Sequence, residues 1–592
     1  MSLVAQVKER AAKAIEDLYK VPVIADDVQV SQTKPEFEGD YTVVLFAFVK
    51  SLRKSPEALG NEIGGYLVEH HKELFTGYNV IKGFLNLAVS DTYFVQFLSE
   101  QYNQPEQGKQ PSTGLKMMVE YSSPNTNKPL HLGHLRNNFL GWSVAEILKA
   151  TGNEVMKTCI VNDRGIHICK SMIAWQQLGN DETPESTGIK GDHLVGDFYV
   201  RFNDEYKRQV TELVEKGMPK EEAERQAPIM QQTQQMLVDW ENGKPEVMEL
   251  WSRMNSWVYK GFDETYKRIG SDFQKTYYES ETYLLGRKFV EMGLEKGVFY
   301  RKEDGSVWID LTDEGLDEKL VLRRDGTSVY ITQDLGLAQQ KYEEFRYDQS
   351  IYVIGDEQNY HMKVLKLILK KLELPYADGI HHLSYGMVEL PTGRMKSREG
   401  TVVDADDLVD EMVKIAAHHT QESGKVKDFN EEELKDLYEI IALGALKFFL
   451  LRVDPKKKMI FNPEESIDFH GFTGPFIQYT HARIKSILRK EQPKSGKLDA
   501  AGGLLKLEKE LLLLLEQFST VVKQAAEEHN PSVIATYAFT VAQAYNTFYT
   551  KHSVMNAESE EKKQLRLQLC VLTANVIRNA MQLLGIRVPE KM

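Results

Sequence analysis

The stretch that decides the fold is SSPNTNKPLHLGHLRNN, residues 122–138, which places two histidines, two prolines and a glycine at the start of a helical pattern. Residues 116–121, KMMVEY, precede it as a short apolar run typical of a strand, and apolar residues at helical spacing follow it as far as Gly152. A second strand-like run, NEVMKTCIVND, completes a strand–helix–strand unit. His131 and His134 therefore lie on a strand-to-helix connection, where a doubly wound sheet holds phosphate groups. We predict an α/β chain built on a doubly wound (Rossmann-type) parallel sheet.

Composition and periodicity divide the remainder of the chain into further units. A polar stretch rich in Pro, Gly and Gln at 103–114 is typical of a linker that follows a small N-terminal module. Beyond the first sheet strands, a polar and mainly helical stretch interrupts the alternation, and strands are expected again at 307–311, 328–332 and 350–356. We predict an N-terminal α/β domain at 1–110, a catalytic domain at 115–410 with a helical insertion at about 185–310, and a C-terminal α-helical bundle at 430–592.

The bulk composition restricts the class of protein. The 592 residues carry a net charge of −14 and include only three cysteines, which form neither a disulfide framework nor a zinc pattern. The apolar run at 511–515 is far too short to span a bilayer, and the N-terminus reads as an amphipathic helix rather than a signal peptide. We therefore expect a cytoplasmic protein without a membrane segment. Between 441 and 490, however, nine lysines and arginines stand against four acidic residues, with aromatic residues among them. Such a mixture is typical of a surface that binds unpaired bases. Alternatively, the basic residues form a solvated face over aromatic residues of the core.

Three interpretations apply to the two histidines. A metal site is disfavoured, because the glutamate of an HExxH motif is absent and no third ligand is evident. The histidines could instead only cap the helix. The third interpretation is phosphate contact: Gly133 lets a nucleotide approach the backbone, the helix N-terminus supplies N–H groups, and the imidazoles of His131 and His134 donate to oxygens that gain charge.

A second basic element follows a predicted strand near residue 390. In PTGRMKSREGTVVDADDL, residues 391–408, two glycines bracket a run of cations. Cations on a glycine-flanked loop at the carboxyl edge of a sheet suit a polyphosphate leaving group. A basic loop alone is weak evidence, but in this order after the histidine motif it becomes strong.

These residues carry a resemblance to a known family. HLGH resembles the HIGH signature of class I aminoacyl-tRNA synthetases, and RMKSR looks like a diverged KMSKS loop. The segments VEYSSPNTNKPLHLGHLRNN, VNDRG, SVYITQDLG, GFTGPFIQYTHARI and LLGIRVPEKM are all similar to arginyl-tRNA synthetases, and the resemblance runs from end to end of the chain.

The resemblance implies a two-step reaction. The carboxylate of L-arginine attacks the α-phosphorus of Mg²⁺-bound ATP, and the terminal adenosine of tRNA(Arg) then takes the arginyl group on its 2′-hydroxyl. The family needs no protein nucleophile and no metal held by the protein, and a monomer is expected. It also implies that bound tRNA precedes arginine activation. Here the two lysine positions of KMSKS read Arg394 and Ser397, so our hypothesis is that Lys128 and Lys396 share the contact to pyrophosphate.

The resemblance also implies sets of site residues. The catalytic positions read His131, His134, Lys128, Lys396 and Arg398. The expected ATP-binding positions are Gly133, Asn137, His361, Gly386, Met387, Val388, Met395 and Ser397. The expected arginine-binding positions are Glu120, Ser123, Asn125, Tyr330, Asp334 and Gln358. The expected tRNA contacts are Phe84, Asn86, Phe476, Tyr479 and Arg483.

Alternatives stay open at this point. Asp334 could be an ordinary helix N-cap, and Phe84 could be a core residue. At the level of the whole chain, a HIGH-type enzyme that adenylylates another carboxylate, or a non-catalytic tRNA-binding relative, would share part of the pattern.

Overall fold

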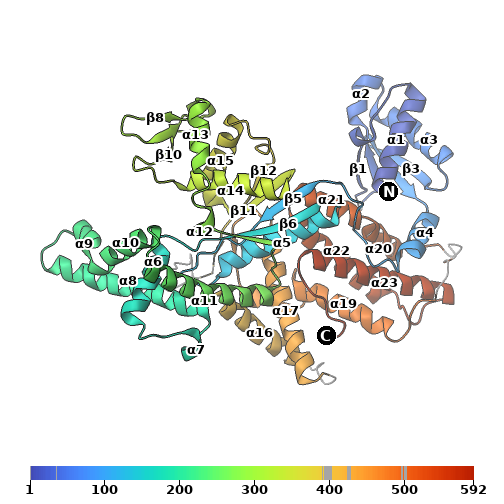
Figure 1. The fold of residues 1–592 in the computed structure, drawn as a ribbon. Helices are drawn as coiled ribbons and strands as arrows, with labels where there is room; N and C mark the ends of the chain where they lie inside the picture. The colour runs from blue at the N-terminus through green and yellow to red at the C-terminus, as the bar shows by residue number, and fades with distance from the viewer. Residues whose placement is uncertain are drawn as a thin grey trace.

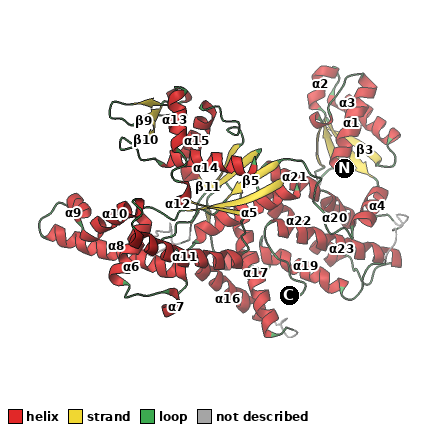
Figure 2. Cartoon of the chain, viewed as in Figure 1, coloured by secondary structure: helices red, strands yellow, loops and turns green. Residues whose placement is uncertain are grey.

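The structure of the chain is a computed structural model, which describes residues 2–34, 36–389, 391, 403–422, 429–494, 498 and 503–592. Arg394 and the predicted contacts Met395, Lys396, Ser397 and Arg398 lie outside these residues. Helices dominate, and strands gather in a central sheet and two smaller ones, with one further strand pair (Figure 2).

The central sheet has five strands, all parallel, in the order β12-β11-β5-β6-β7. Their bounds are β5 Lys116–Glu120, β6 Glu154–Val161, β7 Lys275–Tyr278, β11 Gln349–Gly355 and β12 Ile380–Tyr385. The chain starts at the middle strand β5, adds β6 and β7 on one side, and then returns to add β11 and β12 on the other. The direction of winding thus switches between β5 and β11, and ligands of doubly wound sheets bind at the carboxyl ends of the strands beside such a switch.

The segment between β6 and β7 forms the helical insertion, which extends to one side of the sheet (Figure 1). Its helices are α6 Ile166–Leu178, α7 Pro184–Thr187, α8 Gly191–Glu215, α9 Lys220–Gln226, α10 Pro228–Glu241 and α11 Pro245–Ile269. The stretch expected as one helical insertion, 185–310, also contains β7, which pairs with β6. β7 has four residues and lies between the loop after α11 and the short helix at Glu279–Thr282, and so short a strand gives too little of a period-two pattern to be recognised.

A small separate subdomain follows β7. It contains α12 Glu279–Thr282, α13 Arg287–Glu295 and an antiparallel sheet of β8 Tyr300–Arg301, β9 Val307–Ile309 and β10 Lys319–Leu322, with the 3₁₀ turn η2 Thr312–Glu314. The strand predicted at 328–332 is wrong, because helix α14, Tyr330–Phe345, begins there. Ile331, Leu335 and Ala338 are buried at helical spacing, so packing overrides the local β-branched composition.

The chain then crosses the sheet again through η3, Asp356–Gln358, and α15, Asn359–Lys371. After β12, the short strand β13 Val388–Glu389 pairs in parallel with β14 Met459–Ile460. Helix α16, Ala405–Glu422, begins shortly afterwards.

The two ends of the chain form an N-terminal domain and a C-terminal bundle. The N-terminal domain has the sheet β1-β2-β4-β3 and comprises α1 Leu3–Tyr19, η1 Ala25–Asp27, β1 Gln29–Gln32, β2 Tyr41–Val44, α2 Phe46–Leu52, α3 Pro56–His70, β3 Phe75–Ile81, β4 Phe84–Val89 and α4 Asp91–Gln101. The bundle comprises α17 Glu431–Leu451, α18 Pro463–Ser466, α19 Gly474–Leu488, α20 Lys506–Glu516, α21 Phe518–Glu527, α22 Pro531–Lys551 and α23 Glu560–Leu583.

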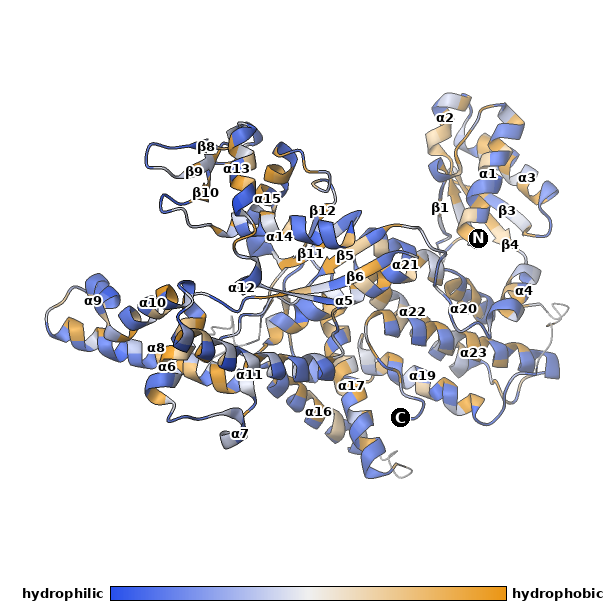
Figure 3. Ribbon diagram, viewed as in Figure 1, coloured by the Kyte–Doolittle hydropathy of each residue, from blue (hydrophilic) through white to orange (hydrophobic). Residues whose placement is uncertain are grey.

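The core follows the apolar faces of these elements (Figure 3). Val119 and Ile351 are fully buried in neighbouring central strands, and Leu132 and Leu135 on helix α5, Leu132–Ala150, are fully buried in the same core cluster. Across the described part of the chain, no helix has the length and apolarity needed to cross a bilayer.

Candidate active site

The histidine turn begins helix α5 directly after the carboxyl end of β5. His131 is the N-cap residue, and its Nδ1 accepts the N–H of Gly133 at 3.2 Å. The Nδ1 of His134 in turn accepts the N–H of His131 at 3.2 Å, and the two rings lie 3.9 Å apart. A nitrogen that accepts an N–H carries no proton of its own, so in both neutral imidazoles the proton lies on Nε2. Each ring therefore caps the helix with one nitrogen and presents a donor with the other.

Burial keeps both histidines uncharged. It lowers the pKa of His131 to about 3, with a further contribution from the nearby charge of Lys128. Burial also holds the pKa of His134 well below its ordinary value, aided by His131 and Lys128. At neutral pH the turn thus offers two neutral Nε2–H donors beside the positive end of a helix.

Lys128 lies on the same loop and adds a cation. Its side chain is partly buried, and burial lowers its pKa. Among the described residues no carboxylate raises the Lys128 pKa against this effect, so its ammonium is available to a ligand.

The residues predicted to bind ATP fall into several environments. An added Cβ at Gly133 would meet the His131 ring at 3.0 Å, so this glycine makes room for the imidazole. The amide of Asn137 donates to the Val353 carbonyl at 2.7 Å and accepts the Ser122 N–H at 2.6 Å, so it joins strand ends inside the protein. Asn137 is therefore already committed to internal hydrogen bonds.

The segment at 386–388 follows β12 and packs against the beginning of β14. The Gly386 N–H donates to the Pro455 carbonyl at 2.9 Å, and an added Cβ at Gly386 would lie 2.6 Å from the Lys457 backbone. The Met387 carbonyl accepts the buried guanidinium of Arg136 at 3.3 Å, and Val388 is buried. The predicted contacts Gly386, Met387 and Val388 thus lie at the same sheet edge as the histidine turn.

A cavity of about 960 Å³ opens at the carboxyl ends of the central strands. All six residues predicted to bind arginine line it, namely Glu120, Ser123, Asn125, Tyr330, Asp334 and Gln358. His361, predicted to bind ATP, lines it too, and its Nε2 lies 2.6 Å from the Asp334 carboxylate. That hydrogen bond raises the pKa of His361.

Helix α14 presents two of these residues to the cavity. Tyr330 is its first residue and is 74% exposed, and Asp334 lies one turn further along. Because the N-cap of α14 is Val329, the alternative interpretation of Asp334 as an N-cap is wrong. Its carboxylate is 38% exposed and faces the cavity beside His361.

Glu120, the last residue of β5, is less available. Its carboxylate is buried and forms an ion pair with Lys341 of α14, whose side chain is fully buried. The Lys341 ammonium also lies 4.3 Å from the centre of the Tyr352 ring. Glu120 lines the cavity as half of a neutralised pair rather than as a free negative charge.

Two acidic residues of the cavity, Glu241 and Glu279, were not predicted from the sequence. Glu279 follows β7 directly, and burial raises its pKa to about 7. Recognising β7 would have identified it, because the carboxyl ends of parallel strands share one edge of the sheet. Arg164, whose guanidinium pairs with Glu241 at 3.0 Å, lines the same cavity and partly offsets that rise.

The residues predicted to contact tRNA differ in exposure. Phe84 is 40% exposed and forms an edge contact with Phe46, so it is not a core residue. Asn86 is buried, and its amide is bonded to Thr42 and Asn79. The Asn86 amide holds β4 to its neighbouring strands, and a direct contact of Asn86 with tRNA stays a prediction.

In the bundle, Phe476, Tyr479 and Arg483 recur along one face of α19 and are partly buried. The Arg483 guanidinium lies 4.8 Å from the centre of the Tyr479 ring and donates to Asn546 at 2.5 Å. The Phe476 ring packs 5.1 Å from that of Phe539. These contacts leave an aromatic and basic face of moderate exposure.

Comparisons with known proteins agree along the whole chain. The family model for the class I (R) tRNA synthetase catalytic domain matches residues 96–462, the DALR anticodon binding domain matches 477–592, and the arginyl tRNA synthetase N-terminal domain matches 5–89. The arginine–tRNA ligase of Bacteroides thetaiotaomicron is 54% identical over 582 residues, 97% of each chain, and that of Amoebophilus asiaticus is 51% identical over 99% of each. The solved Thermus thermophilus arginyl-tRNA synthetase is 26% identical, with a TM-score of 0.83 over the full length of both chains. Because these matches include the site just described and cover nearly the whole chain, the chain belongs to the arginyl-tRNA synthetase family.

Proposed function

We propose that the chain activates L-arginine with ATP and transfers it to the terminal adenosine of tRNA(Arg), with the cavity at the β5–β11 switch point as the arginine site. The observation that supports this most directly is the convergence of six residues from separate segments on one cavity next to the histidine turn. We further propose a cytoplasmic monomer, since the described residues of one chain line the cavity.

In the activation step, charge builds up on the oxygens of the α-phosphate as the arginine carboxylate attacks. The Nε2–H groups of His131 and His134 donate to those oxygens, and the first turn of α5 adds positive potential. Neutral donors suit this role, because they stabilise the developing charge without holding the ground-state phosphate as tightly as a cation would. Catalysis then rests on positioning and charge stabilisation.

Mg²⁺ enters with ATP as part of the substrate. Within the described ranges, one group of side chains has metal-ligand spacing, formed by Asp192, His193 and Asp406. The ammonium of Lys190 lies between its carboxylates, 3.1 Å from Asp192 and 2.7 Å from Asp406. That group already holds a cation, so it does not fit a protein-held metal.

The arginine side chain is recognised by the acidic side of the cavity. A guanidinium takes planar carboxylate partners and aromatic walls. Asp334 and Glu279 supply carboxylates and Tyr330 supplies an aromatic face, whereas Glu120 is compensated by Lys341. We assign the guanidinium to Asp334 and Glu279, with Ser123, Asn125 and Gln358 as polar contacts.

The tRNA extends over two further surfaces. The face of α19 with Tyr479 and Arg483 receives unpaired anticodon bases, and exposed Phe84 of the N-terminal domain contacts the tRNA body. The two surfaces lie in domains that flank one end of the central sheet (Figure 1).

We predict that Lys128→Ala lowers the rate of arginine activation by about ten- to a hundredfold, the range for a lost charge-assisted contact. The measurement is arginine-dependent ATP–pyrophosphate exchange at saturating substrates. Lys149→Ala, an exposed lysine near the far end of α5, is the matched control and should leave the rate unchanged. An unchanged rate in Lys128→Ala would remove Lys128 from the pyrophosphate contact and leave Lys396 to supply it.

We predict that Tyr479→Leu weakens tRNA(Arg) binding by about five- to a hundredfold, because one base loses its stacking partner. Filter binding at fixed salt gives the Kd, and the KM for arginine should not change. Lys523→Gln, at an exposed lysine of α21 in the same bundle, is the control. Equal Kd values for both variants would move the anticodon site away from α19.

The experiment that tests the function is ATP–pyrophosphate exchange with each proteinogenic amino acid, with and without total tRNA. Exchange with arginine alone supports the proposal, and exchange only with tRNA present supports tRNA-dependent activation. Exchange with another amino acid would mean that the cavity is wrongly assigned. No exchange under any condition would indicate a non-catalytic tRNA-binding protein.

A further inference from the structure

A polar cluster joins the root of the helical insertion to the start of α16. The Lys190 ammonium, beside the first turn of α8, lies 2.7 Å from the Asp406 carboxylate and 2.6 Å from the Thr265 hydroxyl of α11. His193 Nε2 lies 3.2 Å from Asp406 and 3.4 Å from Asp404. Three segments that are distant in sequence thus meet at one pair of carboxylates.

Lys190 and Asp406 are held in their charged forms by their partners in the cluster. Burial opposes the charge on Lys190, but Asp192 and Asp406 outweigh it and raise the Lys190 pKa. Burial likewise raises the pKa of Asp406, and His193 and Lys190 together bring it below its ordinary value. Removing one member would leave uncompensated charge in a partly buried place, which is strongly destabilising.

The segment that carries these carboxylates is bonded directly to the histidine turn. The Leu132 N–H donates to the Val403 carbonyl at 3.2 Å, and the Ala405 N–H donates to the Leu130 carbonyl at 3.0 Å. His131 and Asp404 face each other in an antiparallel bridge between these two hydrogen bonds. The backbone at 403–405 therefore sets the position of the backbone at 130–132.

Helix α8 also contacts the turn from its other side. An added Cβ at Gly196 would lie 2.8 Å from the ring of Pro129 and 3.5 Å from the Cα of Lys128. Helix α8 thus packs against the residues before His131. Through Lys190 and His193 it also contacts Asp406, next to the 403–405 segment that pairs with the histidine turn.

We propose that Lys190 and His193 are positioning residues for the activation step: by holding Asp404 and Asp406 they fix the 403–405 backbone and, through it, the Nε2–H donors of His131 and His134. This rests on the proposed role of the two histidines. Catalytic donors must be held closely, because a displacement of about 1 Å costs roughly a hundredfold in rate. Lys190, His193, Asp404 and Asp406, which we call the clamp residues, do not line the arginine cavity, so the clamp acts on the rate of chemistry and not on the affinity for arginine.

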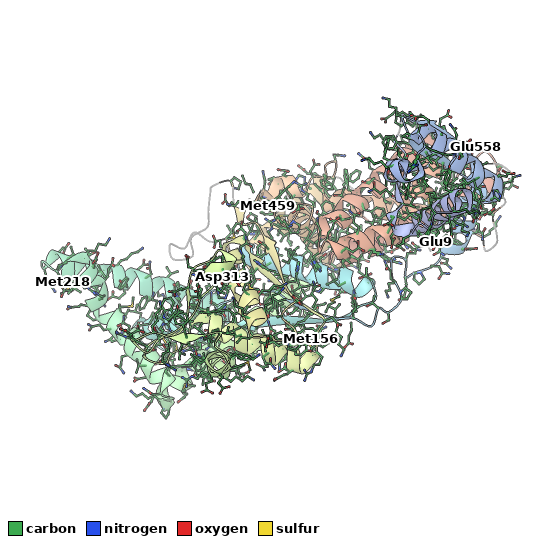
Figure 4. The ribbon with its side chains drawn as sticks, turned by 90° about the horizontal axis from the view of Figure 1, so that it is seen from above. Glu9, Met156, Met218, Asp313, Met459 and Glu558 are labelled. Atoms are coloured by element: carbon green, nitrogen blue, oxygen red, sulfur yellow. The ribbon has the colours of Figure 1, made fainter. Side chains whose placement is uncertain are left out.

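The helical insertion thus has a function at its base, where Lys190 and His193 lie at the start of α8. Met218, just beyond the far end of α8, lies at one extremity of the molecule, and Glu9 and Glu558 lie at the other (Figure 4). A helix the length of α8 spans about 37 Å, so Lys190 and Met218 are far apart. The residues at the root of α8, and not those at its tip, govern activation.

The test is Lys190→Met, assayed by arginine-dependent ATP–pyrophosphate exchange with tRNA present. We expect the kcat to fall by about ten- to a hundredfold while the KM values for arginine and ATP change by less than about twofold. Lys190→Arg, which keeps the cation, should recover most of the kcat. Lys207→Met, an exposed lysine on the same helix, is the matched control and should behave as the unmodified chain.

Active-site titration and the melting temperature separate positioning from folding. A loss explained entirely by a smaller active fraction, a rise in the KM for arginine, or an unchanged kcat would each overturn the proposal. If Lys190→Met does not fold, His193→Ala, which leaves the Lys190–Asp406 pair in place, should lower the kcat by a few fold with unchanged KM. If the histidine variants lose exchange and the clamp variants do not, only this inference fails. If neither set loses exchange, the proposed role of the histidines fails with it.

Discussion

Replacing His134 with asparagine is expected to lower the kcat of arginine-dependent ATP–pyrophosphate exchange by about a hundred- to a thousandfold, the cost of removing one donor to a developing oxyanion. Asparagine places its side-chain oxygen near the position of Nδ1, so it can still accept the His131 N–H and cap the helix. It has nothing at the position of Nε2. The variant therefore removes the donor and keeps the cap.

His134→Gln is the complementary variant. Glutamine at this third helical position can either place its amide near the position of Nε2 or turn its oxygen back to the His131 N–H, as in a capping box, but it cannot do both at once. When its amide replaces the Nε2 donor, the cap to the His131 N–H is lost. Loss of a helix cap costs about 0.5–2 kcal/mol of stability. His134→Gln should therefore have a lower melting temperature than His134→Asn but a higher kcat. If both variants instead melted early and kept their kcat per folded molecule, the histidines would only cap α5, which is the alternative that the sequence left open.

The strand–helix–strand unit around the histidines could be predicted because every signal for it is local. The apolar run of β5, the helical spacing of α5 and the second run of β6 are adjacent in the chain. The order of the remaining strands depends on long-range pairing, which no local pattern encodes. At 328–332 the local pattern favoured a strand. In the structure helix α14 begins there, because Ile331 and Leu335 are then buried together in one hydrophobic cluster.

Several residues that line the cavity could be predicted from the sequence, but their hydrogen-bond and ion-pair partners could not. The segments that resemble the family indicated six residues expected to bind arginine, and all six line one cavity. Sequence could not show that Glu120 is neutralised by Lys341, or that the amides of Asn137 and Asn86 are used inside the protein. It also could not show Glu279, whose role depends on the position of a four-residue strand in the sheet.

Those partners determine the expected result of Asp334→Asn, a rise of about ten- to a hundredfold in the KM for arginine with little change in the KM for ATP. Asparagine can keep the hydrogen bond to His361, so the wall of the cavity is preserved while one negative charge is lost. Steady-state exchange with each substrate varied in turn gives both constants. Equal rises in the two KM values would mean that Asp334 supports the cavity without contacting the guanidinium.

Glu279→Gln distinguishes the two acidic residues by pH. The carboxyl of Glu279 has a pKa of about 7, so it is charged above this pH and neutral below it. In the unmodified chain, kcat/KM for arginine should therefore fall as the pH is lowered from about 8 to about 6, since this ratio reports groups of the free enzyme. Glu279→Gln should have a low kcat/KM that no longer depends on pH in this range, whereas Asp334→Asn should keep the pH dependence.

If kcat/KM still fell with pH in Glu279→Gln, the titrating group would be another one at the cavity. His361 would be the first to examine, because its pKa is raised by Asp334. Protonation of His361 would add a positive charge next to Asp334 and would also lower kcat/KM for arginine as the pH falls. The pH profile alone therefore does not distinguish His361 from Glu279, and the two variants do.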